Sequence, residues 1–290
     1  MISARASFIC AVFLIISEGA PVVRNPVVAG QFYPGSKEAL KRDVGALIDA
    51  NADKKNVIGA VSPHAGYAYS GKVAGATLSL IKPKRTYIIL GPNHTGLGAN
   101  FAIDTNEAWN TLLGSVRIDS HLADRIEKDC PYIKYDGAAH EHEHSIEVQL
   151  PFLQILQKDF AIVPICAAYA DPGAYGEIGA AIAASVKGLR AEKDVAIIAS
   201  SDMTHYESAS SAKEKDSAAI GAILRLDEKS LIRKVAEMDI SMCGYAPAAI
   251  MLAAAKELGA KSARLVDYRT SGDATGDYSS VVGYAGIIIL

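Results

Sequence analysis

The stretch from Gly59 to Gly71, GAVSPHAGYAYSG, constrains the fold more than any other part of the chain. A short run that contains β-branched residues, 57–61, stops at Pro63, and His64 follows at once. Glycines then lead into a helical pattern that begins at Lys72. This order predicts a strand, a sharp turn and a helix, with one imidazole at the carboxyl end of the strand. In open α/β sheets that edge is where ligands bind, because the loops converge there on a crevice.

The same pattern returns at two later strands. The apolar run 86–90 ends in a Gly-Pro break and is followed by His94. The apolar run 195–199 is followed by Asp202 and His205. Each of three strands therefore carries a side chain able to bind a metal or a proton just past its last residue. One such strand end carries little information, but three in one chain predict a functional site.

Strands alternate with helices along the whole chain, and no linker, internal repeat or shift in composition divides it. With 290 residues, of which 50% are hydrophobic, the chain is long enough for one large domain with a substantial core. We therefore expect a single α/β domain with a mostly parallel central sheet flanked by helices. We place this domain at residues 25–290, behind an N-terminal extension at residues 1–24.

The extension contains an apolar run, Phe8–Ile16. It is too short to span a bilayer, which takes about 20 residues. We favour an extension ahead of the folded domain or a wrongly assigned start codon. A signal peptide or an anchor is the alternative, although the residues that follow make a poor cleavage site. We expect no membrane association of the domain itself.

Charge and cysteine usage narrow the class of protein. The net charge is −3 and no basic run is present, which argues against nucleic-acid binding. The four cysteines are widely scattered and form no CxxC pair. This spacing disfavours a disulfide framework or a zinc knuckle and favours a reducing compartment, so we expect the protein in the cytoplasm.

His64 and His94 are the first candidates for a shared site. Neighbouring parallel strands lie about 4.8 Å apart, so two imidazoles on successive strand ends could share one ion. Cys243 is a third candidate because it lies just before a predicted helix. A helix N-terminus tends to lower a thiol pKa, which would make a thiolate available as ligand or nucleophile. The alternative for Cys243 is a small buried residue, which is how we interpret the other three cysteines.

Asp202 and His205 form a compact acid–imidazole pair in the segment SSDMTH. Asp202 could orient His205, and His205 could act as a general base because the ordinary pKa of histidine is near neutral. The alternative is an N-capping aspartate beside an exposed histidine.

Histidines and glutamates alternate in the run HEHEH, which spans 140–144. We interpret His140 and His142 as surface residues. His144 and Glu147 are spaced i to i+3 at a predicted helix start, so they would share one face. We expect this pair to support the metal ligands or contact a substrate.

Six segments together make the chain resemble the Memo-like protein family, called AmmeMemoRadiSam system protein B in prokaryotes. They are AGQFYP (29–34), SPHAGYAYSG (62–71), LGPNH (90–94), EHSIEVQLPFL (143–153), SSDMTH (200–205) and MCG (242–244). The family is similar in fold to class III extradiol dioxygenases, which use non-haem Fe(II) to open catechol rings. The prokaryotic family name implies an AMMECR-type protein and a radical SAM enzyme as partners.

The resemblance implies a metal site at His64, His94 and Cys243, with Asp202 and His205 beside it as catalytic residues. The dioxygenases use two histidines and a carboxylate, the ligand set suited to Fe(II) and O₂. A cysteine in the third position is a softer ligand. We therefore expect iron, with copper or zinc as competing ions, and the resemblance does not carry ring-opening activity over to this chain.

Three functions follow, in descending order. The first is a metal-dependent, dioxygenase-type oxidoreductase acting on a small molecule. The second is a module that binds a peptide or metabolite in the same cleft, which Tyr33, Tyr67, Tyr69 and Tyr206 would line. The third is a cysteine hydrolase with Cys243 as nucleophile, His205 as base and Asp202 as the orienting acid.

Overall fold

The computed structural model describes residues 22–290, so the predicted apolar run Phe8–Ile16 lies outside the described residues. Twelve strands of this part of the chain form one sheet. They are β1 (Val23–Arg24), β2 (Gly59–Ser62), β3 (Thr86–Pro92), β4 (Phe101–Ile103), β5 (Ala108–Thr111), β6 (Gly114–Ile118), β7 (Lys134–Tyr135), β8 (Ala161–Ala167), β9 (Val195–Ser200), β10 (His205–Glu207), β11 (Ala263–Thr270) and β12 (Val281–Ile289).

Helices connect most of these strands. The α-helices are α1 (Lys37–Leu47), α2 (Tyr67–Ser79), α3 (Ser120–Asp129), α4 (Leu150–Leu156), α5 (Pro172–Gly188), α6 (Ala209–Leu224), α7 (Glu228–Glu237), α8 (Tyr245–Glu257) and α9 (Gly272–Thr275). Two 3₁₀ turns, η1 (Gly137–Ala139) and η2 (Glu147–Gln149), precede α4. Among the described residues, no helix is long and apolar enough to cross a membrane.

The sheet runs in the order β1-β5-β6-β8-β3-β9-β2-β12-β10, with β11 also paired to β12 and β4 to β8. Its central strands β8, β3, β9 and β2 are parallel, whereas β12 pairs antiparallel with β2. This arrangement confirms a single α/β domain with a largely parallel central sheet flanked by helices. One expectation is wrong: β9 lies between β2 and β3, so His64 and His94 do not follow neighbouring strands.

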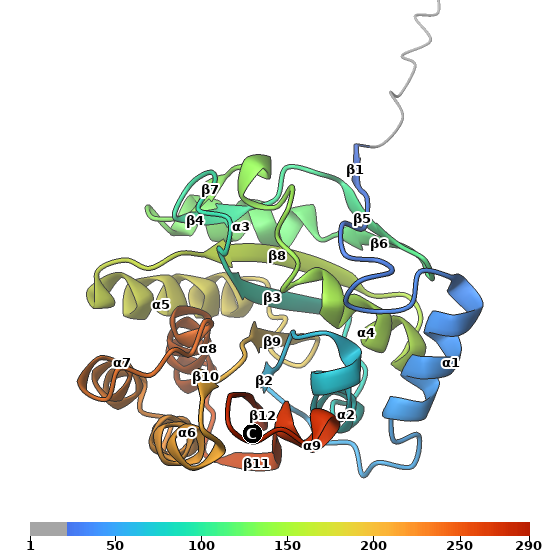
Figure 1. Cartoon of the computed structure of the whole chain (residues 1–290). Coiled ribbons are helices and arrows are strands. Elements are labelled where there is room, and N and C mark those ends of the chain that lie inside the picture. Colours follow the sequence, from blue (N-terminus) through green and yellow to red (C-terminus); the bar gives the residue numbers. More distant parts are fainter. Residues whose placement is uncertain (1–21) are drawn as a thin grey trace, which may run out of the picture.

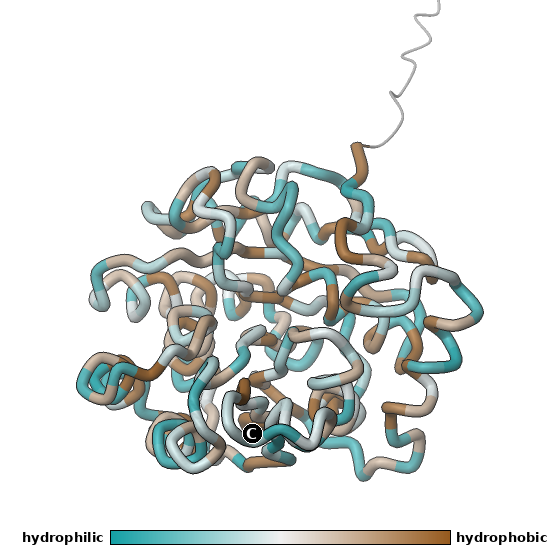
Figure 2. Tube along the Cα trace, viewed as in Figure 1, coloured by the Kyte–Doolittle hydropathy of each residue, from teal (hydrophilic) through white to brown (hydrophobic). Residues whose placement is uncertain are grey.

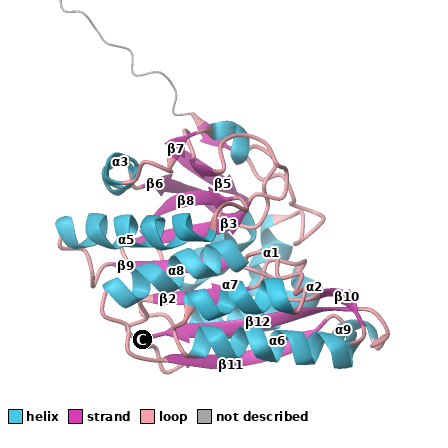
Figure 3. Cartoon of the chain, turned by 90° about the vertical axis from the view of Figure 1, so that its left-hand side faces the viewer, coloured by secondary structure: helices cyan, strands magenta, loops and turns pink. Residues whose placement is uncertain are grey.

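Helices cover both faces of the sheet (Figure 1). Helices α3, α5, α6, α7 and α8 contribute to the hydrophobic core on one face, and α1, α2 and α4 contribute to the core on the other. In β3, Ile88 and Leu90 enter the first core, and Tyr87 and Ile89 enter the second. This alternation follows from the period of two residues in a strand, and it explains why the central strands are apolar throughout. Figure 2 shows this apolar centre, and Figure 3 shows the helices against the sheet.

Local signals fix where several helices begin. Ser36 caps α1 and Asp119 caps α3 through side-chain hydrogen bonds to the first turn, as their residue types predict. Pro151 lies in the first turn of α4, where its missing N–H costs nothing, and the 3₁₀ turn η2 directly precedes this helix.

The described domain includes β1, two residues ahead of the boundary that the sequence predicts. β1 pairs in parallel with β5. The Arg24 side chain is buried, forms an ion pair with Glu147 at 2.7 Å and stacks over the Trp109 ring at 4.0 Å. It also donates hydrogen bonds to the carbonyl oxygens of His140 and Glu143. The N-terminal strand therefore anchors the loop that carries the HEHEH run.

Candidate metal centre

The strand-end residues meet at one edge of the sheet. His64 follows β2, His94 follows β3, and Cys243 lies just before α8. One nitrogen of each imidazole and the Cys243 sulfur all lie within 4.8 Å of one another. Because β9 ends between the two histidine-bearing strands, its last residue, Ser200, lies next to the His64 ring.

His64 is held by contacts on both sides of its ring. Its Nδ1 lies 3.0 Å from the Ser200 hydroxyl, and its Nε2 lies 3.3 Å from the Cys243 sulfur. Its backbone N–H donates to the Asp202 carboxylate at 2.8 Å. Burial, followed by the nearby rings of His94 and His144, holds the pKa of His64 well below its ordinary value. The ring is therefore neutral and keeps a lone pair for a ligand.

His94 is more open to solvent, with 32% of its side chain exposed. The buried Glu143 carboxylate accepts hydrogen bonds from its backbone N–H at 2.7 Å and from its ring Nδ1 at 2.9 Å. A carboxylate can only accept, so His94 presents Nε2 to the cluster. Burial is the largest single influence and raises the pKa of Glu143, but the contacts with His94, the Ser145 backbone N–H and His144 together lower that pKa to about 2. Glu143 is thus the carboxylate that orients His94, as is common for metal-binding histidines.

Sequence reasoning missed this role of Glu143. In the sequence, Glu143 stands out only as one of the glutamates that alternate with histidines in the HEHEH run. The signal that could have found it is its place in the segment EHSIEVQLPFL, directly before a buried apolar stretch.

Cys243 lies against the turn that follows β9. Its sulfur accepts a hydrogen bond from the backbone N–H of Asp202 at 3.3 Å. The next residue, Gly244, donates to the Ser201 hydroxyl, and a Cβ there would collide with the Ser200 carbonyl oxygen. This close approach explains the glycine. Burial, and then the Asp202 carboxylate, raise the pKa of Cys243, which is opposite to the lowering expected from the helix N-terminus.

Asp202 and His205 follow β9 three residues apart, but their side chains do not bond to each other. Asp202 accepts from the backbone of His64 and Ala65, and burial raises its pKa to about 6. The Nδ1 of His205 lies 2.9 Å from the Ser241 carbonyl oxygen. Asp202 therefore orients the His64 turn in this structure, not His205. The hydrolase arrangement also lacks a bond between Cys243 and His205, because the sulfur contacts His64 instead.

His144 adds a third imidazole to the cluster. Its ring stacks on His94 with centroids 4.8 Å apart and meets His64 edge-on at 5.6 Å. Phe32 packs against it at 4.6 Å. Glu147 does not hydrogen-bond to these rings. The Glu147 carboxylate accepts hydrogen bonds from Arg24 and Tyr33, both at 2.7 Å. His144 therefore lies at the candidate site, and Glu147 belongs to the Arg24 anchor.

The surface assignment of His140 is wrong. His140 is fully buried, its Nε2 lies 2.9 Å from the Ala102 carbonyl oxygen, and its ring packs edge-on against Trp109. The polar residues next to His140 in the sequence indicate a surface loop, so its burial is not visible from the sequence. His142 is exposed, as expected.

The tyrosines that the binding hypothesis invokes differ in exposure. Tyr33 and Tyr67 are buried, and the Tyr67 hydroxyl donates to the Val148 carbonyl oxygen at 2.6 Å. Tyr69 and Tyr206 are exposed, and Tyr206 has a φ of 59°, which is uncommon for a residue other than glycine. Tyr33 and Tyr67 nevertheless line a pocket of about 690 Å³ beside α1 and α2, so both pairs border space that a ligand could reach.

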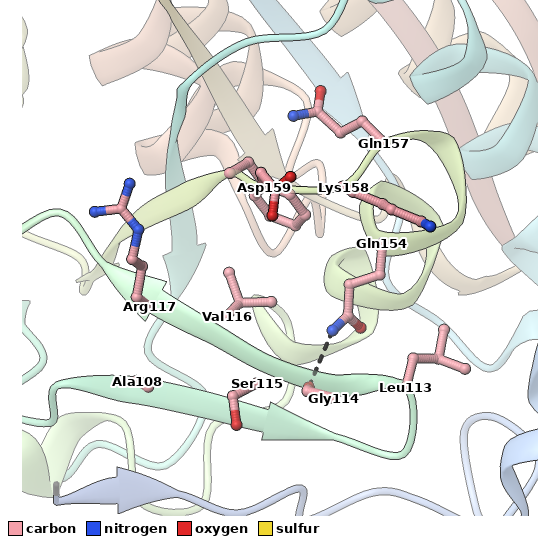
Figure 4. Close-up of a pocket in the computed structure, with 11 residues that line it drawn as sticks. Ala108, Leu113, Gly114, Ser115, Val116, Arg117, Gln154, Gln157, Lys158 and Asp159 are labelled. Carbon is pink, nitrogen blue, oxygen red and sulfur yellow. Dashed lines mark hydrogen bonds between the residues drawn. The ribbon is translucent and has the colours of Figure 1, made fainter.

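A cavity of about 700 Å³ lies elsewhere, between the β5–β6 hairpin and the end of α4. Figure 4 shows Arg117, Gln154 and Lys158 around it. None of the candidate metal ligands lines this cavity, so it is separate from the cluster.

The residues present fit a transition metal. Two imidazoles and one thiol offer soft and borderline donors, a set that suits iron, copper or zinc better than magnesium or calcium. Both imidazoles are held through Nδ1, by Ser200 and by Glu143. Supporting hydrogen bonds of this kind are typical of metal-binding histidines.

Comparisons with known proteins agree with the resemblance seen in the sequence. The model of the Memo-like protein family matches residues 24–288. A MEMO1 family protein of Methanopyrus kandleri is 43% identical over 279 residues, covering 91% of this chain and 98% of the relative. Relatives with the same family name from Methanococcoides burtonii and Aquifex aeolicus are 45% and 42% identical. Each covers 92% of this chain, and the match spans 100% and 99% of their own lengths.

Proposed function

Because the chain belongs to the Memo-like protein family, we propose that it is a metal-binding protein whose ion is held by His64, His94 and Cys243. The observation that carries this proposal is that these three ligand atoms lie within 4.8 Å of one another, while Nδ1 of each imidazole is hydrogen-bonded to Ser200 or Glu143. We propose iron as the ion, with copper and zinc as competitors. A reducing cytoplasm suits the centre, because there Cys243 stays available as a thiol.

The activity proposed for this centre is oxidation of a small molecule in the manner of a dioxygenase. Bound iron would supply a redox-active Lewis acid. His205 is the candidate base. Its Nδ1 faces a carbonyl oxygen, which can only accept, so Nδ1 carries the proton and Nε2 is free to take one from a substrate. Asp202 holds the His64 turn through the backbone, and His144 stacks on His94 beside it.

A second candidate is a non-catalytic module that binds a peptide, a metabolite or a protein partner over the same edge. It is favoured by the exposed Tyr69 and Tyr206 and by the strained backbone of Tyr206. An AMMECR-type protein and a radical SAM enzyme are the partners that this second proposal names.

The test is metal analysis of protein purified without oxygen. Wild type, Cys243→Ser and Cys166→Ser are compared. Cys166 is a matched control because it is buried but belongs to a different cluster, against Ala139 and His140. We expect about one transition metal per chain in wild type and Cys166→Ser, and a marked loss in Cys243→Ser. Equal metal in all three folded proteins, or none in any, would contradict the metal centre.

Catalysis is tested separately. Metal-loaded wild type and His205→Gln are supplied with catechol-like compounds while O₂ consumption is recorded. We expect His205→Gln to keep its metal and lose turnover. If wild type binds such compounds without consuming O₂, the binding module becomes the better description.

A further inference from the structure

A buried chain of hydrogen bonds lies behind His64. The Ser62 hydroxyl donates to the Gln149 side-chain oxygen at 2.8 Å. The Gln149 amide nitrogen donates to the Pro63 carbonyl oxygen at 3.0 Å and to the Ser200 hydroxyl at 2.9 Å. The Ser200 hydroxyl in turn reaches Nδ1 of His64. Ser62, Gln149 and Ser200 are each fully buried, so water does not compete for these bonds.

The direction of each hydrogen bond in this network follows from the backbone carbonyl oxygens, which can only accept. The Pro63 carbonyl can only accept, which fixes Gln149 with its nitrogen toward Pro63 and Ser200. The Ser200 hydroxyl lies 2.7 Å from the Ser145 carbonyl oxygen, which also can only accept. Ser200 has one proton, and this contact uses it. Its two lone pairs then accept from Gln149 and from His64.

We propose that Ser200, held in place by Gln149, is a positioning residue that fixes His64 as the Nδ1–H tautomer. The imidazole therefore directs the Nε2 lone pair at the Cys243 sulfur and into the candidate metal cluster. This inference deepens the proposed metal centre and rests on it for its biological meaning. The tautomer itself belongs to the metal-free protein, so it can be tested without any metal.

The network explains why this arrangement needs serine. The hydroxyl acts as donor to one group and acceptor for two, which uses its full hydrogen-bonding capacity. An alanine at position 200 would leave His64 Nδ1 and the Ser145 carbonyl oxygen without a partner in a buried place. With that acceptor gone, the ring proton is free to move to Nε2, where it would occupy the position that a metal needs.

The decisive measurement is the tautomer of His64 in metal-free protein, read from nitrogen–proton correlation spectra of histidine rings labelled with ¹⁵N. The His64 signals are identified by their loss in His64→Ala. We expect the proton on Nδ1 in wild type. A proton on Nε2 in wild type would overturn the inference directly, whether or not any variant folds.

Two serine variants make a matched pair. Ser200→Ala removes the hydroxyl that faces His64. Ser145→Ala removes an equally buried hydroxyl that has no hydrogen-bond partner, and it leaves the Ser145 carbonyl in place. We expect Ser200→Ala to populate the Nε2–H tautomer and to weaken iron or zinc binding by about 10–100-fold. We expect Ser145→Ala to match wild type in both measurements, and Ser200→Thr, which keeps a hydroxyl, to retain the Nδ1–H tautomer.

The outcomes separate this inference from the proposed function. If wild type shows the Nδ1–H tautomer but binds no metal, the metal centre fails and the positioning role stands. If wild type binds metal at His64 but Ser200→Ala keeps both the tautomer and the affinity, the positioning role is wrong and the metal centre stands. Circular dichroism and thermal unfolding confirm that the variants compared are folded.

Discussion

Replacing Arg24 by methionine tests the anchor between β1 and the loop that carries Glu143 and His144. Methionine keeps much of the apolar stem but removes the guanidinium, which stacks over Trp109 and donates to the carbonyl oxygens of His140 and Glu143. The Glu147 carboxylate then remains buried without its cation, although it keeps hydrogen bonds from Tyr33 and from two backbone N–H groups. The change therefore removes the ion pair together with the stacking on Trp109 and the hydrogen bonds to the two carbonyl oxygens.

The expected loss of stability follows from the burial of both side chains of the ion pair. The Arg24 and Glu147 side chains are 4% and 0% exposed and lie 2.7 Å apart. Removing one partner of such a buried pair costs about 3–5 kcal/mol, because the remaining charge is uncompensated. In a chain of this size a loss of about 4 kcal/mol lowers the unfolding midpoint by roughly 10 °C.

Thermal and urea unfolding of wild type, Arg24→Met and Arg42→Met measure this effect. Arg42 is the control, since its ion pair with Asp43 is exposed and is worth about 0–1 kcal/mol. Adding Glu147→Gln to Arg24→Met should recover part of the lost unfolding free energy, because it replaces the unpaired Glu147 carboxylate by a neutral amide. An Arg24→Met protein no less stable than Arg42→Met would refute the reasoning.

Two further predictions concern stability. Gly75→Ala places a Cβ against the Leu47 carbonyl oxygen where α2 meets α1, so we expect a loss of about 1–3 kcal/mol in urea unfolding. Gly45→Ala in α1 meets no atom within 4 Å and should gain about 0.5–1 kcal/mol; a reversed order would contradict the packing argument. Burial raises the pKa of Asp216, against the hydrogen bonds from Thr204 and Tyr268, so the folded state binds its proton more tightly than the unfolded state does. Wild type should therefore lose stability relative to Asp216→Asn as the pH rises above the ordinary carboxyl value of about 4, and a difference that grows in the opposite direction would disprove the assignment.

The sequence predicts the elements of the fold well because their signals are local. The apolar run before His64, the cap at Ser36 and the glycine after Cys243 each depend on residues a few positions apart. The gathering of His64, His94 and Cys243 at one edge was also expected, because parallel strands end on the same side and the family resemblance named the same three residues.

What the sequence could not show depends on contacts between distant segments. No local pattern reveals that β9 separates β2 from β3 and brings Ser200 behind His64. The burial of His140 depends on β1 and β5, which cover a loop that is polar in sequence. Glu143 was missed for the same reason: its role as an acceptor appears only when His94 lies above it.

The pairing of β12 with β2 has a consequence for how the chain is assembled during synthesis. Gly59 pairs with Ile289, so the strand that carries His64 receives one of its two neighbours only after the other described strands have left the ribosome. Until then β2 presents an open row of backbone N–H and C=O groups, which invites pairing with another chain. Nascent chains that stop before β12 should therefore aggregate or engage chaperones, however well their helices have formed.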